Sequence, residues 1–179
     1  TGIMVIWING AFGVGKTTTA EELNKLIKDS FIYDPEMADE FIWDNSPQCI
    51  KEKGDFQDIP MWRDFNYSML KYIHENYSGT IIVPMTLTNK EYYGQIIERL
   101  IKEGVALQHY ILIAKKSVIL ERLSKRGEDD NSWTVQQIDR CLNAFEKDIN
   151  GIKIDANAST KEVVRIILGN NYKDIDLND

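Results

Sequence analysis

Four residues near the beginning of the sequence have the types and the spacing needed to bind phosphate. Gly10, Gly15, Lys16 and Thr17 match the pattern G-x-x-x-x-G-K-[ST]. Glycines let successive backbone N–H groups turn inward around a phosphate, and the N-terminus of a following helix adds partial positive charge. The lysine of such a loop reaches the β- and γ-phosphates, and the threonine hydroxyl binds Mg²⁺. The pattern therefore predicts a nucleotide site with Thr17 as a metal ligand.

The residues on both sides of this pattern supply the elements that such a loop requires. The apolar run at 3–8 predicts a buried strand, and the stretch at 17–27 has helical period, with Ala20, Leu23 and Ile27 on one face. A strand that runs into the loop and a helix that leaves it make a chance match to the pattern improbable.

Short β-rich runs alternate with longer stretches of helical period along the whole chain. We expect strands at 3–8, 30–34, 80–86, 105–114 and 151–156. Parallel strands need crossovers long enough to hold a helix, so the alternation predicts an α/β fold with a mostly parallel sheet. No repeat or linker divides the 179 residues, and we expect one domain over 1–179.

Polar residues follow three of the expected strands, where ligands of such sheets bind. They are Asp34 and Glu36, Thr86 and Thr88, and Asp155 and Asn157. We expect them to converge on the glycine-rich loop, with Glu36 and Thr86 as substrate contacts. Asp34 is the candidate to position Mg²⁺ or to accept a hydroxyl proton, because the third strand ends without an acidic residue. Asp34 as a cap of the next helix is the alternative.

Arginines on the C-terminal side could stabilise charge on a transferred phosphoryl group. Arg122 and Arg126 are four residues apart and share a helix face that leads into the polar stretch 125–133, a candidate lid. Arg140 follows that stretch and could close on the same phosphates. Surface ion pairs are the alternative for each arginine, and a solvated connection is the alternative for the lid. Arg63 is a candidate substrate contact.

Two apolar stripes are interpreted as core. Trp62, Phe65, Met69 and Ile73 recur at helical spacing after Pro60. In the next helix Ile96, Leu100 and Ile101 are expected to pack in the same way.

Composition excludes several classes of function. The formal net charge of −7 argues against a broad basic surface for nucleic acid or for anionic membranes. Only Cys49 and Cys141 are present, so neither a disulfide framework nor a zinc cluster is indicated. No apolar run approaches the length of a membrane span. We expect a cytoplasmic protein that has no nucleic-acid partner and no stable membrane association.

A GTPase is disfavoured because its base-reading motif is incomplete. Asn89 and Lys90 resemble the first two positions of N-K-x-D, but Tyr92 stands where the aspartate belongs.

With these residues assembled, the sequence closely resembles the tunicamycin-resistance ATP-binding protein family of small P-loop kinase-like proteins. The resemblance spans nearly the whole chain and includes IWINGAFGVGKTTTA, DFQDIPMWRDFNYSML and NSWTVQQIDRC. It implies a nucleoside- or shikimate-kinase-like three-layer fold with a five-stranded parallel sheet in the order 2-3-1-4-5. The family's nucleotide loop corresponds to Gly10, Ala11, Phe12, Gly13, Val14, Gly15, Lys16, Thr17 and Thr18. The segment 155–164, with Asp155 and Asn157, resembles the loop on the adenine side.

These observations favour an ATP- and Mg²⁺-dependent kinase that acts on a hydroxyl of a small molecule, such as a nucleoside-type antibiotic. Lys16, Asp34, Arg122, Arg126 and Arg140 are the candidate catalytic residues. A protein that sequesters a drug and uses ATP only to order its lid is the first alternative, and an ATPase that drives a partner's conformational change is the second.

Overall fold

A five-stranded parallel sheet forms the centre of the protein. The computed structural model describes residues 4–51 and 55–172. The strands are β1 (Met4–Gly10), β2 (Ser30–Ile32), β3 (Thr80–Pro84), β4 (Leu107–Ile113) and β5 (Ile152–Asp155). They pair in the order β2-β3-β1-β4-β5, all parallel. The predicted α/β class and strand order are confirmed.

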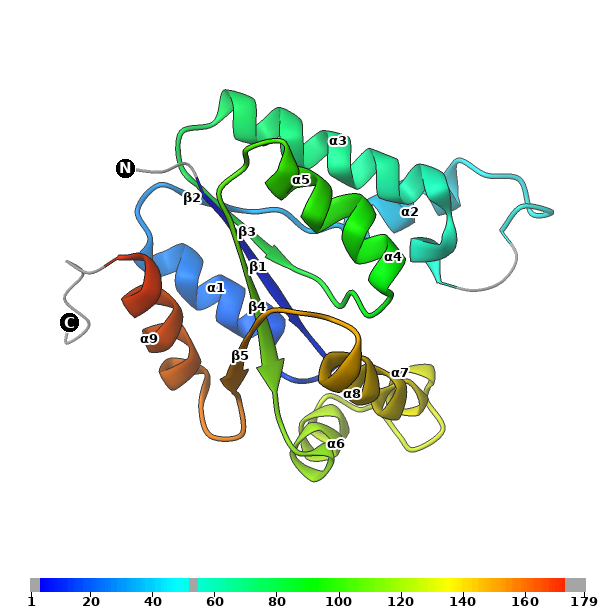
Figure 1. Ribbon diagram of the computed structural model, residues 1–179. Coiled ribbons are helices and arrows are strands. Elements are labelled where there is room, and N and C mark those ends of the chain that lie inside the picture. The colour runs from blue at the N-terminus through cyan, green and yellow to red at the C-terminus, as the bar shows by residue number, and fades with distance from the viewer. Residues whose placement is uncertain (1–3, 52–54, 173–179) are drawn as a thin grey trace.

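Helices connect each strand to the next. They are α1 (Lys16–Leu26), α2 (Glu36–Asp44), the 3₁₀ turn η1 (Phe56–Asp58), α3 (Pro60–Asn76), α4 (Lys90–Tyr93), the π-helical turn η2 (Gly94–Glu98), α5 (Arg99–Lys102), α6 (Lys116–Lys125), α7 (Trp133–Gln136), α8 (Ile138–Lys147) and α9 (Thr160–Asn171). In Figure 1, α3, α4 and α5 lie on one side of the sheet and α1 and α9 on the other. The arrangement is a three-layer sandwich.

Strand β1 shows how the sequence builds this sandwich. Val5 and Trp7 belong to the apolar core beneath α3 and α5, whereas Ile6 and Ile8 belong to the core beneath α1 and α9. Successive side chains of a strand point to opposite faces, so an uninterrupted apolar run suits a strand covered on both sides. All four side chains are fully buried.

The buried face of α3 differs from the predicted stripe. Trp62 is fully buried as expected, but Phe65 is exposed, and Asn66 and Tyr67 point inward in its place. The two polar side chains find partners there, because the Tyr33 hydroxyl donates to Asn66 Oδ1 at 2.5 Å and the Tyr67 hydroxyl donates to Glu103.

The next apolar pattern fails at one of its three positions. Ile96 and Leu100 are buried, but Ile101 is exposed. Ile101 directly follows Leu100 and therefore lies about 100° further around the helix, outside the buried face.

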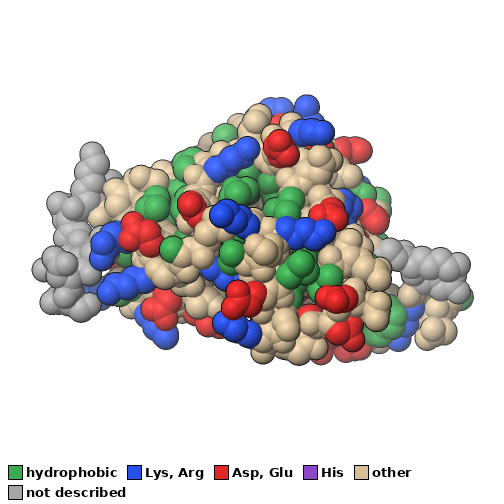
Figure 2. Space-filling model, turned by 90° about the horizontal axis from the view of Figure 1, so that it is seen from below, with side chains coloured by type: hydrophobic (Ala, Val, Ile, Leu, Met, Phe, Trp, Pro, Cys, Tyr) green, Lys and Arg blue, Asp and Glu red, His purple; other side chains and the backbone are tan. Residues whose placement is uncertain are grey.

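All strands point toward the lower end of Figure 1, where α6, α7 and α8 gather. Figure 2 views the molecule from that side, and on the face that it shows basic and acidic side chains are interspersed. Among the residues described, no helix has the length and apolar character needed to cross a membrane.

Candidate active site

The glycine-rich loop (residues 10–17) turns sharply between β1 and α1. Gly13 has φ +82°, and a Cβ there would lie 2.6 Å from Leu123 Cγ of α6, so only glycine fits this close approach. Gly15 has φ +111° and is the residue preceding α1, with open space around it. The first-turn backbone N–H groups of α1 therefore face solvent at the carboxyl ends of the strands.

Lys16 lies folded against this loop. Its Nζ donates to the carbonyl of Ala11 at 2.9 Å and lies 5.6 Å from the centre of the Phe12 ring. Burial of the ammonium lowers the pKa of Lys16 to about 8, and the nearby charge of Arg126 contributes in the same direction. An anion bound in the loop would restore the usual stability of this charge.

A cavity of about 1010 Å³ opens beside the loop. Its wall includes Lys16, Thr17 and Thr18 from the loop side, Ala158 from the segment between β5 and α9, and Thr160 at the start of α9. The positive ammonium, the two hydroxyls and the free helix N-terminus suit the phosphates of a nucleotide and an accompanying Mg²⁺.

Arg122 and Arg126 also line this cavity, but they differ in their contacts. Arg122 Nη1 donates to the carbonyl of Val14 at 2.9 Å and Nη2 donates to that of Asn157 at 3.3 Å. Arg122 therefore ties the glycine-rich loop to the segment after β5. Arg126 follows the last residue of α6, and it lines the cavity with its charged side chain.

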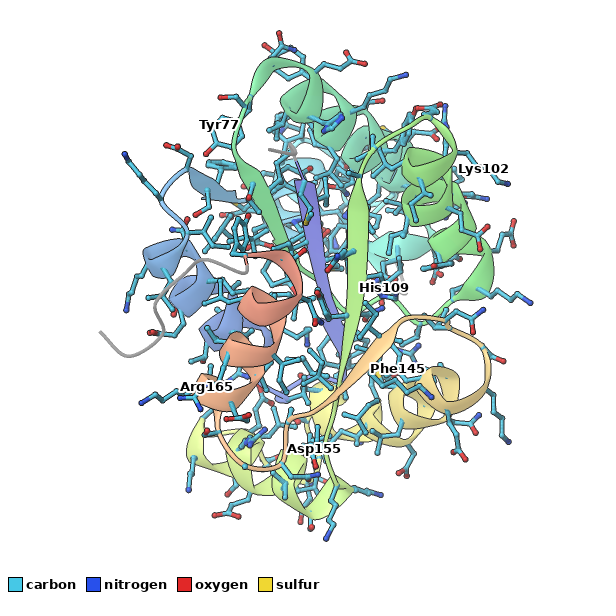
Figure 3. All side chains as sticks on the ribbon, turned by 60° about the vertical axis from the view of Figure 1, so that its left-hand side comes forward. Tyr77, Lys102, His109, Phe145, Asp155 and Arg165 are labelled. Carbon is cyan, nitrogen blue, oxygen red and sulfur yellow. The ribbon has the colours of Figure 1, made fainter. Side chains whose placement is uncertain are left out.

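Asp155 and Asn157 build the turn after β5. Asp155 Oδ1 accepts from the backbone N–H and the side-chain amide of Asn157, both at 2.8 Å. Asn157 Oδ1 in turn accepts from the backbone N–H of Lys115 at 2.7 Å. These contacts fix the segment that carries Ala158 and Thr160, and Figure 3 shows Asp155 at the lower end of β5.

Asp34 and Glu36 line the same cavity as Arg122 and Arg126. Asp34 Oδ1 accepts from the backbone N–H of Glu36 at 2.9 Å, which is the contact expected from the alternative in which Asp34 caps the next helix, and the second oxygen accepts from no described residue. Burial raises the pKa of Glu36, and the neighbouring Asp34 carboxylate raises it further. Both carboxyl groups border the cavity that also contains Lys16.

Two further cavities continue from the first. The second, of about 560 Å³, is lined by Asp55, Gln57, Asp58, Thr88, Asn89, Tyr92, Trp133, Gln137 and Arg140. The third, of about 280 Å³, is lined by Phe12, Glu36, Asp39, Asp55, Phe56, Gln57, Met85 and Trp133.

Trp133 borders all three cavities. It begins α7, is 54% exposed, and its ring centre lies 5.4 Å from that of Phe12 at an angle of 59°. The two rings thus line both the large cavity, which contains Lys16, and the third cavity, which contains Asp55.

Three of the predicted site residues make contacts away from the large cavity. Arg140 Nη1 donates to Thr88 Oγ1 at 2.7 Å, and this arginine lines the second cavity. Thr86 is buried and donates to the carbonyl of Gly10 at 2.8 Å. Arg63 is also buried and donates to Gln95 Oε1 at 2.5 Å and to the carbonyl of Gln57 at 2.7 Å. Thr86 and Arg63 line none of the three cavities and serve as framework.

Comparison with known proteins identifies the family. A family described as AAA domain matches residues 6–147. The structure of a tunicamycin resistance protein from Deinococcus radiodurans is 30% identical in sequence, with a TM-score of 0.77 over 93% of this chain and 94% of that one. The chain belongs to the tunicamycin resistance protein family. A search of the curated proteins gave no match.

The fold of this tunicamycin resistance family member extends to more distant kinases. A gluconokinase from Sinorhizobium meliloti 1021 is 17% identical, with a TM-score of 0.66 over 93% of this chain and 90% of that one. A shikimate kinase from Bacteroides thetaiotaomicron is also 17% identical, with a TM-score of 0.59 over 93% and 96%. At this identity the likeness concerns the fold, which is that of P-loop kinases.

Several residues of the family member's site were not among the sequence candidates. Trp133, Asp39, Asp55 and Gln57 line the cavities, but nothing in their local spacing indicates chemistry. An exposed tryptophan inside a polar stretch was the one available signal, because large aromatic side chains in such positions often contact ligands. Asn89, by contrast, caps α4 by accepting from the backbone N–H of Glu91 at 2.9 Å.

Proposed function

We propose that this protein is an ATP- and Mg²⁺-dependent phosphotransferase that acts on a hydroxyl of a small molecule. The observation that carries the proposal is the arrangement around the large cavity. Lys16, Thr17 and Arg126 line one part of its wall and the carboxyl groups of Asp34 and Glu36 line another. Cations and hydroxyls suit the phosphates, and a carboxylate suits a hydroxyl proton.

ATP supplies the phosphoryl group when it is bound. In this proposal Lys16 leaves the carbonyl of Ala11 to contact the phosphates, and Thr17 and Asp34 hold Mg²⁺ or its water ligands. Arg126 neutralises charge at the transferred group, whereas Arg122 acts by fixing the loop through Val14. Asp34 accepts the hydroxyl proton with the oxygen that does not cap α2.

The acceptor side is assigned to the two smaller cavities. They adjoin the large one at Trp133 and contain hydroxyl, amide, carboxylate and aromatic side chains, which are suited to a polar organic molecule. The family relationship makes tunicamycin the first compound to test. Closure of 125–133, which carries Arg126 and Trp133, would exclude water from the transfer.

A sequestering protein that binds ATP without transfer is the second candidate. The observation that favours it is that β3 ends at Pro84 and continues with Met85 and Thr86, so no acidic residue follows that strand closely.

Mass spectrometry of the protein with ATP, Mg²⁺ and a panel of acceptors separates the two candidates. The panel contains tunicamycin, nucleosides, aminoglycosides and simple sugars. We expect one product that is heavier by a phosphoryl group, no product with Lys16→Ala, and a loss of about a hundredfold or more with Asp34→Asn.

The control variant is Glu121→Gln. It removes one negative charge, as Asp34→Asn does, but on the exposed face of α6, where Glu121 pairs with Lys125. Tight binding of a panel compound without product or ADP would favour sequestration. Full transfer by Asp34→Asn would remove the role of that carboxylate.

A further inference from the structure

The third cavity has a chemically one-sided wall. Its polar members are Glu36, Asp39, Asp55 and Gln57, and its remaining members are three aromatic rings and Met85. Among the described residues that line it there is no lysine, arginine or histidine. This wall offers carboxylate oxygens and the faces of aromatic rings, both of which attract positive charge.

Gln57 presents an unused acceptor to the same space. The side chain is 94% buried, as 6% is exposed, and its Nε2 donates to the carbonyl of Thr86 at 2.7 Å. This contact fixes which end of the amide carries the NH₂ group. Gln57 Oε1 accepts no hydrogen bond from any residue that the structure describes, although the residue lines both smaller cavities. An acceptor that lines a cavity and has no protein donor is available to a donor group of a ligand.

Two of the three carboxyl groups, those of Asp39 and Asp55, are held by the protein through one oxygen each. Asp39 Oδ1 accepts from the indole N–H of Trp62, and Asp55 Oδ1 accepts from the backbone N–H of Gln57 at 3.1 Å. These contacts orient both side chains and leave the second oxygen of each without a protein donor in the described part of the chain. The cavity is therefore preorganised for a molecule that donates several hydrogen bonds.

The same groups are electrostatically unfavourable when the cavity holds no cation. Burial raises the pKa of Asp39 to about 7, and the charges of Glu36 and Asp55 raise it further against the opposing contact from Trp62. Burial also raises the pKa of Asp55, although the charge of Arg140 opposes this from the neighbouring cavity. A positive group among these carboxyls would relieve their repulsion.

We propose that the third cavity binds the ammonium group of the acceptor, which makes the acceptor an amino alcohol or an amino sugar. The assignment rests on the proposed phosphotransferase function, since it names the substrate class of the same site. The cavity shares Phe12, Glu36 and Trp133 with the large one, so a molecule anchored there by nitrogen can extend a hydroxyl toward Lys16 and Asp34.

An organic ammonium fits this space better than a metal ion does. In the described ranges, no three carboxyl, thiol or imidazole groups come together in a way that could hold a metal ion. Aromatic rings contribute nothing to metal coordination in proteins of this kind, whereas Phe12, Phe56 and Trp133 present apolar and π surface to an alkylammonium.

Binding measurements without ATP test the assignment independently of transfer. The probes are amines paired with hydroxyl analogues: ethanolamine with ethylene glycol, glucosamine with glucose, and 2-deoxystreptamine with 2-deoxy-scyllo-inositol. Ligand-observed NMR gives the dissociation constants at pH 7.5. We expect at least one amine to bind about tenfold or more tightly than its analogue.

Asp39→Asn and Asp55→Asn are expected to reduce that preference by about tenfold, because asparagine keeps the hydrogen bonds to Trp62 and Gln57 but loses the charge. Asp64→Asn is the matched control, since Asp64 lies on the exposed face of α3 with its side chain 77% accessible. It should bind the amine as the unmodified protein does, and melting temperatures verify that all three variants fold.

The assignment is overturned if no amine in the panel is preferred to its hydroxyl analogue, or if the preference survives both substitutions. Amine binding without any phosphorylated product would keep the subsite and end the phosphotransferase proposal. Phosphorylation of a neutral acceptor such as tunicamycin, with no preference for amines, would do the reverse.

Discussion

The pKa of Lys16 depends on whether an anion is bound in the glycine-rich loop. Its ammonium is satisfied by the carbonyl of Ala11 and by the face of Phe12, and neither partner carries a full negative charge. The pKa near 8 follows mainly from this burial, which outweighs the opposing charge of Glu36. A bound phosphate supplies the missing charge, so the pKa of Lys16 must rise when nucleotide binds.

We therefore predict that nucleotide affinity falls as the pH rises through about 8. Below this value Lys16 is protonated in the free and bound protein, and its contribution is constant. Above it the free protein must take up a proton to bind, and the dissociation constant should increase by up to about tenfold per pH unit. Calorimetric titration with ATP and Mg²⁺ between pH 7.5 and 9.5 measures this slope, and Lys16→Ala provides a weak but flat reference.

The positions of cavity-lining residues were predictable where spacing within one segment encodes them. Lys16, Arg122 and Arg126 were chosen from fixed intervals in the sequence, and all three line the large cavity. Trp133 and Asp39 could not be found in this way, since their place beside Phe12 depends on contacts between segments that are far apart in the sequence. Arg63 is the converse: its type suggested a ligand contact, but it is buried, lines none of the three cavities, and donates to the side chain of Gln95 and the carbonyl of Gln57.

At the scale of elements, the packing of α6 on the glycine-rich loop holds the site in shape. Leu123 is fully buried and lies directly beneath Gly13, and Arg122 fastens the same helix to Val14. A movement of α6 would therefore displace the glycine-rich loop directly, without any change in the sheet.

We predict that Gly13→Ala and Leu123→Ala are coupled. Gly13→Ala should cost about 2 kcal/mol of unfolding free energy, because it combines positive φ with a 2.6 Å clash, and Leu123→Ala about 3 kcal/mol for its cavity. In the double variant the new methyl group occupies the space left by leucine, so the loss should be about 1 kcal/mol smaller than the sum. Urea denaturation of all four proteins measures this, and simple additivity would show that the two sites do not touch in solution.

Element prediction succeeded for strands because their apolar runs have two buried faces. The expected and observed strands overlap at every one of the five positions, with ends that differ by a few residues. The details of α3 and η2 were missed for a different reason. Asn66 can point inward because the Tyr33 hydroxyl supplies it with a hydrogen-bond partner in the core. The π-helical turn η2 is too short to produce a repeating apolar pattern in the sequence.

At the scale of the whole molecule, one buried network joins four segments behind the site. Asn9 at the end of β1 donates to the carbonyl of Leu87 at 2.8 Å and to His109 Nε2 at 3.1 Å. His109 lies on β4 (Figure 3), and its Nδ1 donates to the carbonyl of Asn150 at 2.9 Å. Both imidazole nitrogens are thereby assigned, with Nε2 as the acceptor, and the ring is held neutral.

We predict that this network makes the protein less stable in weak acid. Burial lowers the pKa of His109 from 6.5 to about 4. Between these pH values the imidazole is protonated in the unfolded chain but neutral in the folded protein. Stability from this residue is complete above about pH 7.5 and falls by about 1.4 kcal/mol at pH 5.5.

Urea denaturation at the two pH values measures the loss, and His109→Gln should lack this part of it. The comparison between the two proteins matters, because the raised pKa of Asp39 acts in the opposite direction, favouring the folded state as the pH falls through 7. An identical pH dependence in both proteins would contradict the assignment of a neutral His109.

The two ends of the described chain lie at the amino ends of the strands, whereas the cavities lie at the carboxyl ends. β1 begins there, and α9 ends on the same side, where the Tyr172 hydroxyl contacts Thr80 at the beginning of β3. A group attached near Met4 or Tyr172 would therefore lie on the side away from the three cavities described above. The fold is therefore well suited to immobilisation in a sensor, in which the ligand-binding edge is presented to the sample and the connection lies behind it.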